Sequence, residues 1–108
     1  TCFRRWYFTE TNRRDAERFL EQPHNGKGTF LIRPSDTNQG QESLSVLDLT
    51  KDKHFHVKHY RIRRTNQGMY YISSKTTFGS LQDLVEHYQS KKTETNETNV
   101  DLILFFFV

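Results

Sequence analysis

The chain has 108 residues, a length that fits one domain with one modest core. Its share of hydrophobic residues (33%) and of charged residues (27%) is typical of a soluble globular protein, and a net charge of +3 favours anionic partners only mildly. The single Cys2 excludes an intramolecular disulfide and a cysteine-based zinc cluster, and no apolar run approaches the roughly 20 residues that span a bilayer. We therefore expect a single domain over residues 1–108, from a reducing compartment, with no bound metal or cofactor.

The first elements in the chain are a short aromatic strand at 6–8 and an amphipathic helix over 12–22. Asn12 is a suitable N-cap residue for this helix. The apolar face of the helix is predicted to consist of Ala16, Phe19 and Leu20. Arg13 lies in the first turn, where the helix dipole disfavours a cation and attracts an anion, so a bound anion would suit this position.

A buried strand follows at 29–32, and it ends in an arginine. Side chains alternate along a strand, so Arg33 points the same way as Leu31 and starts out close to the core. A guanidinium in that position is costly to desolvate unless it meets an anion. The strand alone leaves several alternatives open: an internal carboxylate such as Asp48, an exposed strand end, or a bound anionic ligand.

Hairpin-linked strands and a second helix complete the chain. We expect strands over 42–49, 55–64 and 69–72, with turns at 50–53 and 66–68. The second helix begins after the N-cap Ser80, and its apolar face consists of Leu81, Leu84, Val85 and Tyr88. A polar surface loop at 90–99 and an apolar strand or tail at 102–108 follow. This order predicts an α+β fold, a central antiparallel sheet flanked by two helices.

One side of the predicted sheet gathers side chains that suit a phosphate dianion. Guanidinium groups bind phosphate through two parallel hydrogen bonds, hydroxyls donate further ones, and the loop amides at 36–38 can form an anion-binding nest. Phosphotyrosine is a good ligand candidate, because phosphoserine is too short to reach a charge at the floor of the sheet. The candidate residues are Arg13, Arg33, Ser35, Thr37, Ser43, His59 and Arg61.

Several motifs resemble the SH2 domain family. The segment Phe30-Leu31-Ile32-Arg33-Pro34-Ser35 is similar to the family signature Phe-Leu-Val-Arg-Glu-Ser. Further matches at the expected spacings are Trp6-Tyr7-Phe8, Arg13, Leu44-Ser45-Val46, Val57-Lys58-His59-Tyr60-Arg61-Ile62, Phe78-Gly79-Ser80-Leu81, Leu84-Val85 and His87-Tyr88. The resemblance covers roughly residues 4–89, leaving 90–108 divergent, and it is closest to the SH2 domains of Src-type cytoplasmic tyrosine kinases.

The resemblance implies a role for each candidate in binding phosphotyrosine. Arg33 makes two hydrogen bonds to the phosphate, and Arg13 contacts the phosphate and the face of the ring. His59 lines the pocket and helps to hold Arg33, while Arg61 flanks the phenol ring. The hydroxyls that bind phosphate oxygens belong to Ser35, Thr37 and Ser43. Without the resemblance, the polar candidates also fit ordinary turn, strand or helix-face positions.

The resemblance also implies a second, apolar pocket for the side chain three positions after phosphotyrosine. Tyr60 and Ile72 would shape this pocket. The sequence departs from the family at Pro34, which replaces a common Glu and removes a backbone donor, and this is tolerable at a strand end. It also lacks the family's Gly-Leu segment after the second helix, so an aliphatic preference at the second pocket is a weaker expectation.

A hydrolase and a small basic nucleic-acid-binding domain are the alternative function classes. Ser, His and Asp are present, but a nucleophile elbow, a Walker loop and a His-Glu-x-x-His motif are missing, as is the Gly-rich signature of RNA-recognition domains. The resemblance instead implies a non-catalytic, monomeric module from a larger non-receptor tyrosine kinase. We expect it to work in the cytoplasm, or at the inner membrane face through other parts of its parent, without a membrane span. Its partners would be phosphotyrosine peptides, including the parent's own phosphorylated tail, and not nucleic acids.

Overall fold

The computed structural model describes residues 5–90 and 106–107, and the chain falls into two compact units. The described part of the first unit runs to Arg61 and includes Phe106 and Phe107. The described part of the second unit runs from Ile62 to Ser90. Residues 91–105, which hold most of the predicted polar loop, lie outside the described residues.

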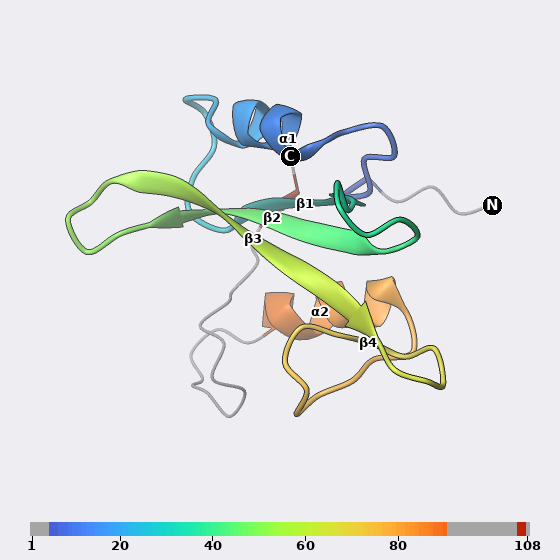
Figure 1. Ribbon diagram of the computed structural model, residues 1–108. Coiled ribbons are helices and arrows are strands. Elements are labelled where there is room, and N and C mark those ends of the chain that lie inside the picture. Colours follow the sequence, from blue (N-terminus) through green and yellow to red (C-terminus); the bar gives the residue numbers. More distant parts are fainter. Residues whose placement is uncertain (1–4, 91–105, 108) are drawn as a thin grey trace. The chain divides into compact units, whose positions relative to one another are not determined.

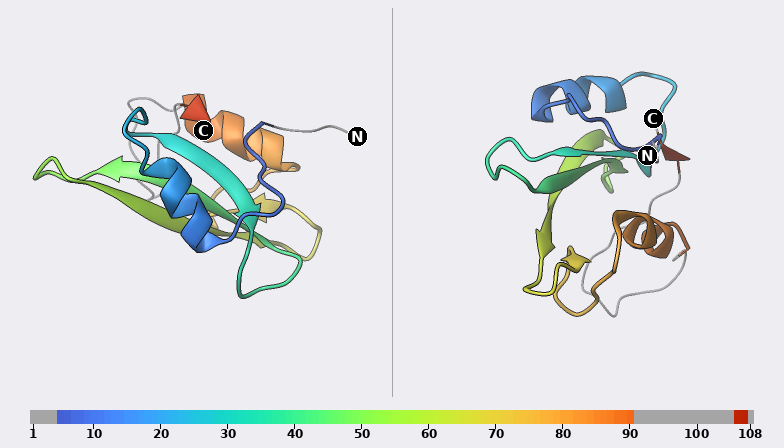
Figure 2. Two further views of the ribbon diagram at one scale, coloured as in Figure 1. Left: turned by 90° about the horizontal axis from the view of Figure 1, so that it is seen from above. Right: turned by 90° about the vertical axis from the view of Figure 1, so that its right-hand side faces the viewer.

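The first unit is a sheet with one helix. Its strands are β1 (Thr29–Pro34), β2 (Glu42–Leu49), most of β3 (Phe55–Arg64) and β5 (Phe106–Phe107), in the order β3-β2-β1-β5. β1 and β2 are antiparallel, with Arg33 opposite Ser43. The helix α1 (Arg13–Leu20) lies across one face of β1 and β2, as Figures 1 and 2 show.

The second unit holds the end of β3, the strand β4 (Tyr70–Tyr71) and the helix α2 (Leu81–Ser90). β4 pairs antiparallel with β3, with Tyr71 opposite Arg63. Ser80 caps α2 as expected, since its hydroxyl accepts from the Asp83 N–H at 3.0 Å. The residues buried in this unit are Ile62, Phe78, Leu84, Val85 and Tyr88.

The α+β class, with an antiparallel sheet and two helices, is confirmed, but three expectations about the elements were wrong. The predicted strand at 6–8 is a single bridge between Tyr7 and Ile32. The predicted strand at 69–72 is reduced to β4. Ser90, expected to open the loop, ends α2. In addition, β5 pairs parallel with the start of β1, at the edge of the antiparallel sheet.

The core of the first unit explains the course of α1. Ala16 and Leu20 of α1 form a buried cluster with Leu31 and Leu47 of the sheet, and Phe8 and Val57 are partly buried against it. Asn12 caps the helix, because its side-chain oxygen accepts from the Asp15 N–H at 2.8 Å. Phe19, expected on the buried face, is 42% exposed and packs against Phe8 in a tilted arrangement, with ring centroids 5.7 Å apart.

Strand alternation places Arg33 in the same row as Leu31, on the face that α1 covers in part. The opposite face of the sheet is fully apolar and buried at Phe30, Ile32, Leu44 and Val46. Arg33 therefore stands at the end of a rigid strand, beyond the last apolar layer beneath α1.

Candidate functional site

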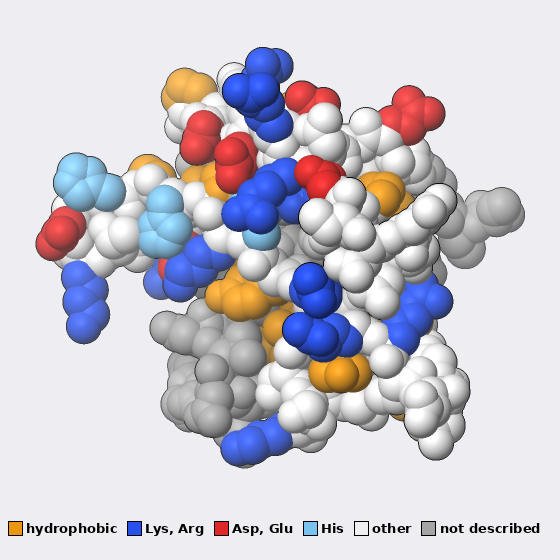
Figure 3. Space-filling view, in the orientation of Figure 1, with side chains coloured by type: hydrophobic (Ala, Val, Ile, Leu, Met, Phe, Trp, Pro, Cys, Tyr) orange, Lys and Arg blue, Asp and Glu red, His pale blue; other side chains and the backbone are white. Residues whose placement is uncertain are grey.

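A cavity of about 190 Å³ opens in the first unit beside α1, the loop after β1 and the middle of β3. Its lining residues are Arg13, Arg33, Ser35, Asp36, Thr37, Ser43, His59, Tyr60 and Arg61. The cavity thus brings together all seven residues predicted to bind phosphotyrosine. With three guanidinium groups and one carboxylate, the lining has a formal charge of +2, which is opposite to that of a phosphate dianion. Figure 3 shows basic side chains beside acidic ones and a histidine just below α1.

Arg33 is the buried cation of this cavity, with only 2% of its surface exposed. Its Nε donates to the Ser45 hydroxyl at 3.0 Å, and its Nη1 donates to the Pro34 carbonyl at 3.2 Å. Its Nη2 lies 3.2 Å from Nδ1 of His59. These contacts hold the guanidinium plane in one orientation, so a ligand meets a preorganised fork.

The internal carboxylate that meets Arg33 is that of Asp36, not Asp48. Arg33 Nη1 lies 3.3 Å from Asp36 Oδ1, and the Asp36 side chain is 42% exposed. Asp48 is instead paired with Lys58 at 2.8 Å. Burial lowers the pKa of the Arg33 guanidinium, and nearby Arg13 lowers it further, while Asp36 raises it. The group remains charged, because the unperturbed pKa of arginine is far above 7.

His59 links Arg33 to α1. Its Nε2 lies 2.8 Å from a Glu17 carboxylate oxygen, and its Nδ1 lies 2.8 Å from the Ser45 hydroxyl. Because Glu17 can only accept, Nε2 carries the proton and Nδ1 is the acceptor for Ser45 and Arg33. Burial lowers the pKa of His59, as do the charges of Arg13 and Arg33, although the hydrogen bond to Glu17 raises it. A neutral ring is the form that this network requires.

The loop after β1 folds around the Ser35 hydroxyl. Ser35 Oγ accepts from the backbone N–H of Thr37 at 3.3 Å and of Asn38 at 3.1 Å. The Thr37 hydroxyl donates to the Asn38 side chain at 3.0 Å. The amides of Thr37 and Asn38, two of the three loop residues predicted to form an anion nest, thus donate to a hydroxyl of the loop itself. The nest remains a prediction.

The other predicted residues differ in how firmly they are held. Arg13 and Arg61 are exposed at the cavity, and Arg13 Nε lies 3.8 Å from Glu17. Ser43 is buried opposite Arg33. Tyr60, expected at the second pocket, borders this same cavity. Ile72 is half-buried in the second unit, so the Tyr60 and Ile72 pair remains a prediction.

Sequence reasoning missed three residues of the site, namely Glu17, Asp36 and Ser45. Ser45 lies two positions after Ser43 in β2, and strand alternation could therefore have placed both on the face of the site. Glu17 follows Arg13 by one helical turn, which places both on the same face of α1. Asp36 gave no signal beyond its place in a polar loop three residues after Arg33.

Comparison with known proteins decides the family. The model of the SH2 domain family matches residues 6–88 of the chain. The chain belongs to the SH2 domain family. This SH2 domain is 48% identical over 83 residues to tyrosine-protein kinase Fgr of mouse. The aligned part covers 77% of the chain but only 16% of Fgr, so the similarity concerns a small part of that relative.

The family assignment confirms the resemblance to SH2 domains of Src-type tyrosine kinases and the function that it implied. SH2 domains are phosphotyrosine-binding modules of tyrosine-kinase signalling and are not catalysts. Neither alternative, the hydrolase or the nucleic-acid-binding domain, is supported. Among the described residues, helices are too short or too polar to cross a membrane.

Proposed function

We propose that the cavity beside α1 is the phosphotyrosine pocket of this SH2 domain and that Arg33 binds the phosphate. The observation that carries this proposal is the buried guanidinium of Arg33, fixed by Ser45, Pro34 and His59 yet bordering an open cavity of positive formal charge. Charge-assisted, partly desolvated hydrogen bonds to a dianion are the strongest contacts that such a site can make. Arg33 therefore contributes most of the affinity for phosphate.

The remaining lining residues have supporting roles. Arg13 and Arg61, which are exposed at the cavity, close around the phosphate and the phenol ring. His59 is a positioning residue, because it contacts Arg33 and anchors it to α1. The hydroxyls offered to phosphate oxygens are those of Ser35, Thr37 and Ser43. The depth of Arg33 favours phosphotyrosine over phosphoserine, whose phosphate cannot extend as far from the peptide backbone.

We further propose two-pronged recognition, in which a peptide residue three positions after phosphotyrosine enters an apolar pocket shaped by Tyr60 and Ile72. This part rests on the family resemblance and on the half-buried state of both side chains. An aliphatic residue at that peptide position suits such a pocket. A library of phosphotyrosine peptides varied at the third following position tests it, and uniform affinity across the library would contradict it.

We propose that the two units form one SH2 domain and that the domain is monomeric. The family model spans both units, from residue 6 to residue 88, which supports this view. Urea unfolding followed by Trp6 fluorescence and by circular dichroism should give coincident transitions. Sedimentation at increasing concentration should give a constant mass. Separate transitions or a rising mass would contradict the respective part.

At the level of the whole protein, we propose that the domain comes from a cytoplasmic tyrosine kinase, placed at the inner membrane face by other parts of that kinase. In this setting its ligands would include the kinase's own phosphorylated tail. Similarity to a tyrosine-protein kinase supports the parent class. Expressing the complete gene and assaying tyrosine phosphorylation tests this proposal.

The decisive experiment for the pocket is a calorimetric titration with one peptide in three forms. The residue at the recognised position is phosphotyrosine, tyrosine or phosphoserine, and everything else in the peptide is unchanged. We expect measurable binding of the phosphotyrosine form only. Equal affinity for the phosphotyrosine and tyrosine forms would refute the role given to the cavity.

A further inference from the structure

The Asp36 carboxylate already occupies anion-binding groups of the cavity. Its Oδ1 lies 3.3 Å from Arg33 Nη1, and its Oδ2 accepts from the backbone N–H of Arg13 at 3.2 Å. The second contact matters because Arg13 is the first residue of α1, and the first N–H groups of a helix have no partner within the helix. One carboxylate thus bridges the buried arginine and the start of the helix. Asp36 is the single acidic residue among those lining the cavity.

The contact with Asp36 reduces the number of Arg33 N–H donors that are available to a ligand. A guanidinium has five N–H donors, and within the described residues four contacts engage Arg33. Three of these contacts, to Ser45, Pro34 and His59, hold the side chain in place. At least one N–H is left for a ligand, but bidentate binding of a phosphate needs two. The second N–H that a bidentate phosphate needs is the one on Nη1 that donates to Asp36.

We propose that Asp36 is a built-in competitor for the phosphate, which must displace its carboxylate from Arg33 before binding bidentately. This proposal rests on the proposed function of Arg33 given above. Asp36 thereby lowers the affinity of the pocket for phosphotyrosine and keeps the buried guanidinium paired when no ligand is present.

The exposed fraction of the Asp36 side chain determines how strongly Asp36 lowers the affinity for phosphate. Its side chain is 42% exposed, so a displaced carboxylate turns into water at little cost. Ion pairs of this partly exposed kind contribute up to about 1 kcal/mol, which corresponds to a change of up to roughly fivefold in an equilibrium constant. A purely structural role for Asp36, as a partner of the Arg13 N–H that orders the loop, predicts the opposite sign, because loss of order would weaken binding.

The test compares Asp36→Asn with a matched variant, Asp52→Asn, in calorimetric titrations with a phosphotyrosine peptide. The amide of Asn can still accept from the Arg13 N–H, so Asp36→Asn removes the charge and keeps the shape. Asp52→Asn removes the same charge from the exposed turn between β2 and β3. We expect Asp36→Asn to lower the Kd about three- to fivefold and Asp52→Asn to leave it within about 1.5-fold. A Kd for Asp36→Asn that is unchanged or raised, relative to Asp52→Asn, would overturn the proposal.

A measurement on the unchanged protein keeps the proposal testable if the variants fold poorly. The ¹³C shift of the Asp36 carboxyl should move when inorganic phosphate is titrated, and a constant shift at saturation would contradict displacement. Failure of the proposed function has a different signature. In that case the unchanged protein would not distinguish phosphotyrosine from tyrosine, whereas failure of the Asp36 proposal alone leaves that discrimination intact.

Discussion

The Ser45 hydroxyl lies 2.8 Å from Nδ1 of His59 and accepts from Arg33 Nε at 3.0 Å. Ser45 thus donates to His59 and accepts from Arg33, so its hydroxyl links the two side chains. Ser45 itself has no exposed surface. The orientation of the pocket arginine therefore depends on a small hydroxyl that lies beneath the cavity and does not line it.

Replacing Ser45 with Ala should weaken both the fold and the site. The change leaves the Arg33 Nε–H without its acceptor, and an unsatisfied buried donor costs about 1–3 kcal/mol of the free energy of unfolding. Urea unfolding measures this loss, and calorimetry should show a raised Kd for the phosphotyrosine peptide. Ser74→Ala, at an exposed position, is the control and should change neither quantity. Unchanged stability in Ser45→Ala would contradict the importance of this hydroxyl.

Replacing Glu17 with Gln should lower the pKa of His59 further. Glu17 raises that pKa through its hydrogen bond and its charge, and Gln keeps an acceptor but removes the charge. An NMR titration of the His59 ring signals measures the shift. Glu21→Gln, at the exposed residue that follows α1, serves as the control and should leave the pKa of His59 unchanged. A rise in the pKa of His59 in Glu17→Gln would show that the carboxylate is not its partner.

Stability should decrease as the pH falls below about 6.5, the pKa of an unperturbed histidine. Burial lowers the pKa of His59 in the folded protein, so between the folded and unfolded values the unfolded chain binds more protons. The free energy of unfolding therefore decreases as the pH decreases between the unfolded and the folded pKa of His59. Below the folded pKa, this contribution of His59 levels off. Urea unfolding at a series of pH values measures it.

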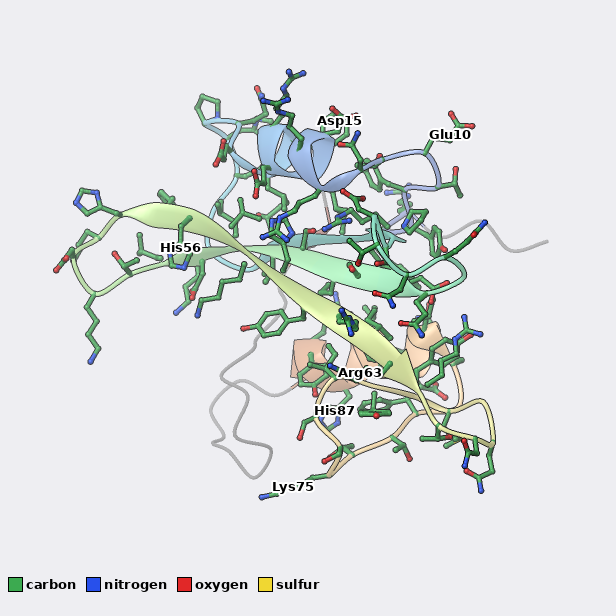
Figure 4. The ribbon with its side chains drawn as sticks, viewed as in Figure 1. Glu10, Asp15, His56, Arg63, Lys75 and His87 are labelled. Atoms are coloured by element: carbon green, nitrogen blue, oxygen red, sulfur yellow. The ribbon has the colours of Figure 1, made fainter. Side chains whose placement is uncertain are left out.

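Two histidine variants isolate the contribution of His59 to this pH dependence. His59→Gln should show a shallower dependence than the unchanged protein. His56→Gln should retain the dependence, since His56 lies near the start of β3, away from the cavity lining (Figure 4). Identical pH profiles for the unchanged protein and His59→Gln would assign the effect to other groups.

Replacing Arg33 with Lys should raise the Kd for a phosphotyrosine peptide more than tenfold while the protein stays folded. Lysine keeps the charge but loses the planar fork, and loss of one partner from a desolvated charge pair costs about 2–5 kcal/mol. Arg18→Lys, on the exposed part of α1, should bind like the unchanged protein. A Kd within about threefold of the original value in Arg33→Lys would contradict the role of Arg33.

Most of what could be predicted from the sequence came from the periodic spacing of side chains in strands and helices. Alternation placed Arg33 in the same row as Leu31, and the same rule set His59 and Arg61 on one face of β3, so the strand residues of the cavity lining followed from local patterns. Family motifs supplied the identity of the ligand. Both kinds of information are local in the sequence and therefore visible before folding.

Long-range pairing is the part that local patterns could not give. Glu17 meets His59 across 42 positions and the Arg13 N–H meets Asp36 across 23, and both contacts depend on how α1 sits on the sheet. The exposure of Phe19 has the same origin, because helix periodicity shows an apolar stripe but not how much of it the sheet covers. The parallel pairing of β5 with β1 likewise depends on the path of the chain through space.

The outer edge of β1 is closed along its length by three different means. Phe106 and Phe107 pair with its first two residues, and the backbone of Ile32 exchanges hydrogen bonds with Trp6 and Phe8 at 2.7 and 2.8 Å. Pro34 has the same orientation as Ile32 and has no N–H to offer. A strand from another molecule therefore finds no free ladder along this edge of β1, which protects a buried, largely apolar strand from edge-to-edge pairing.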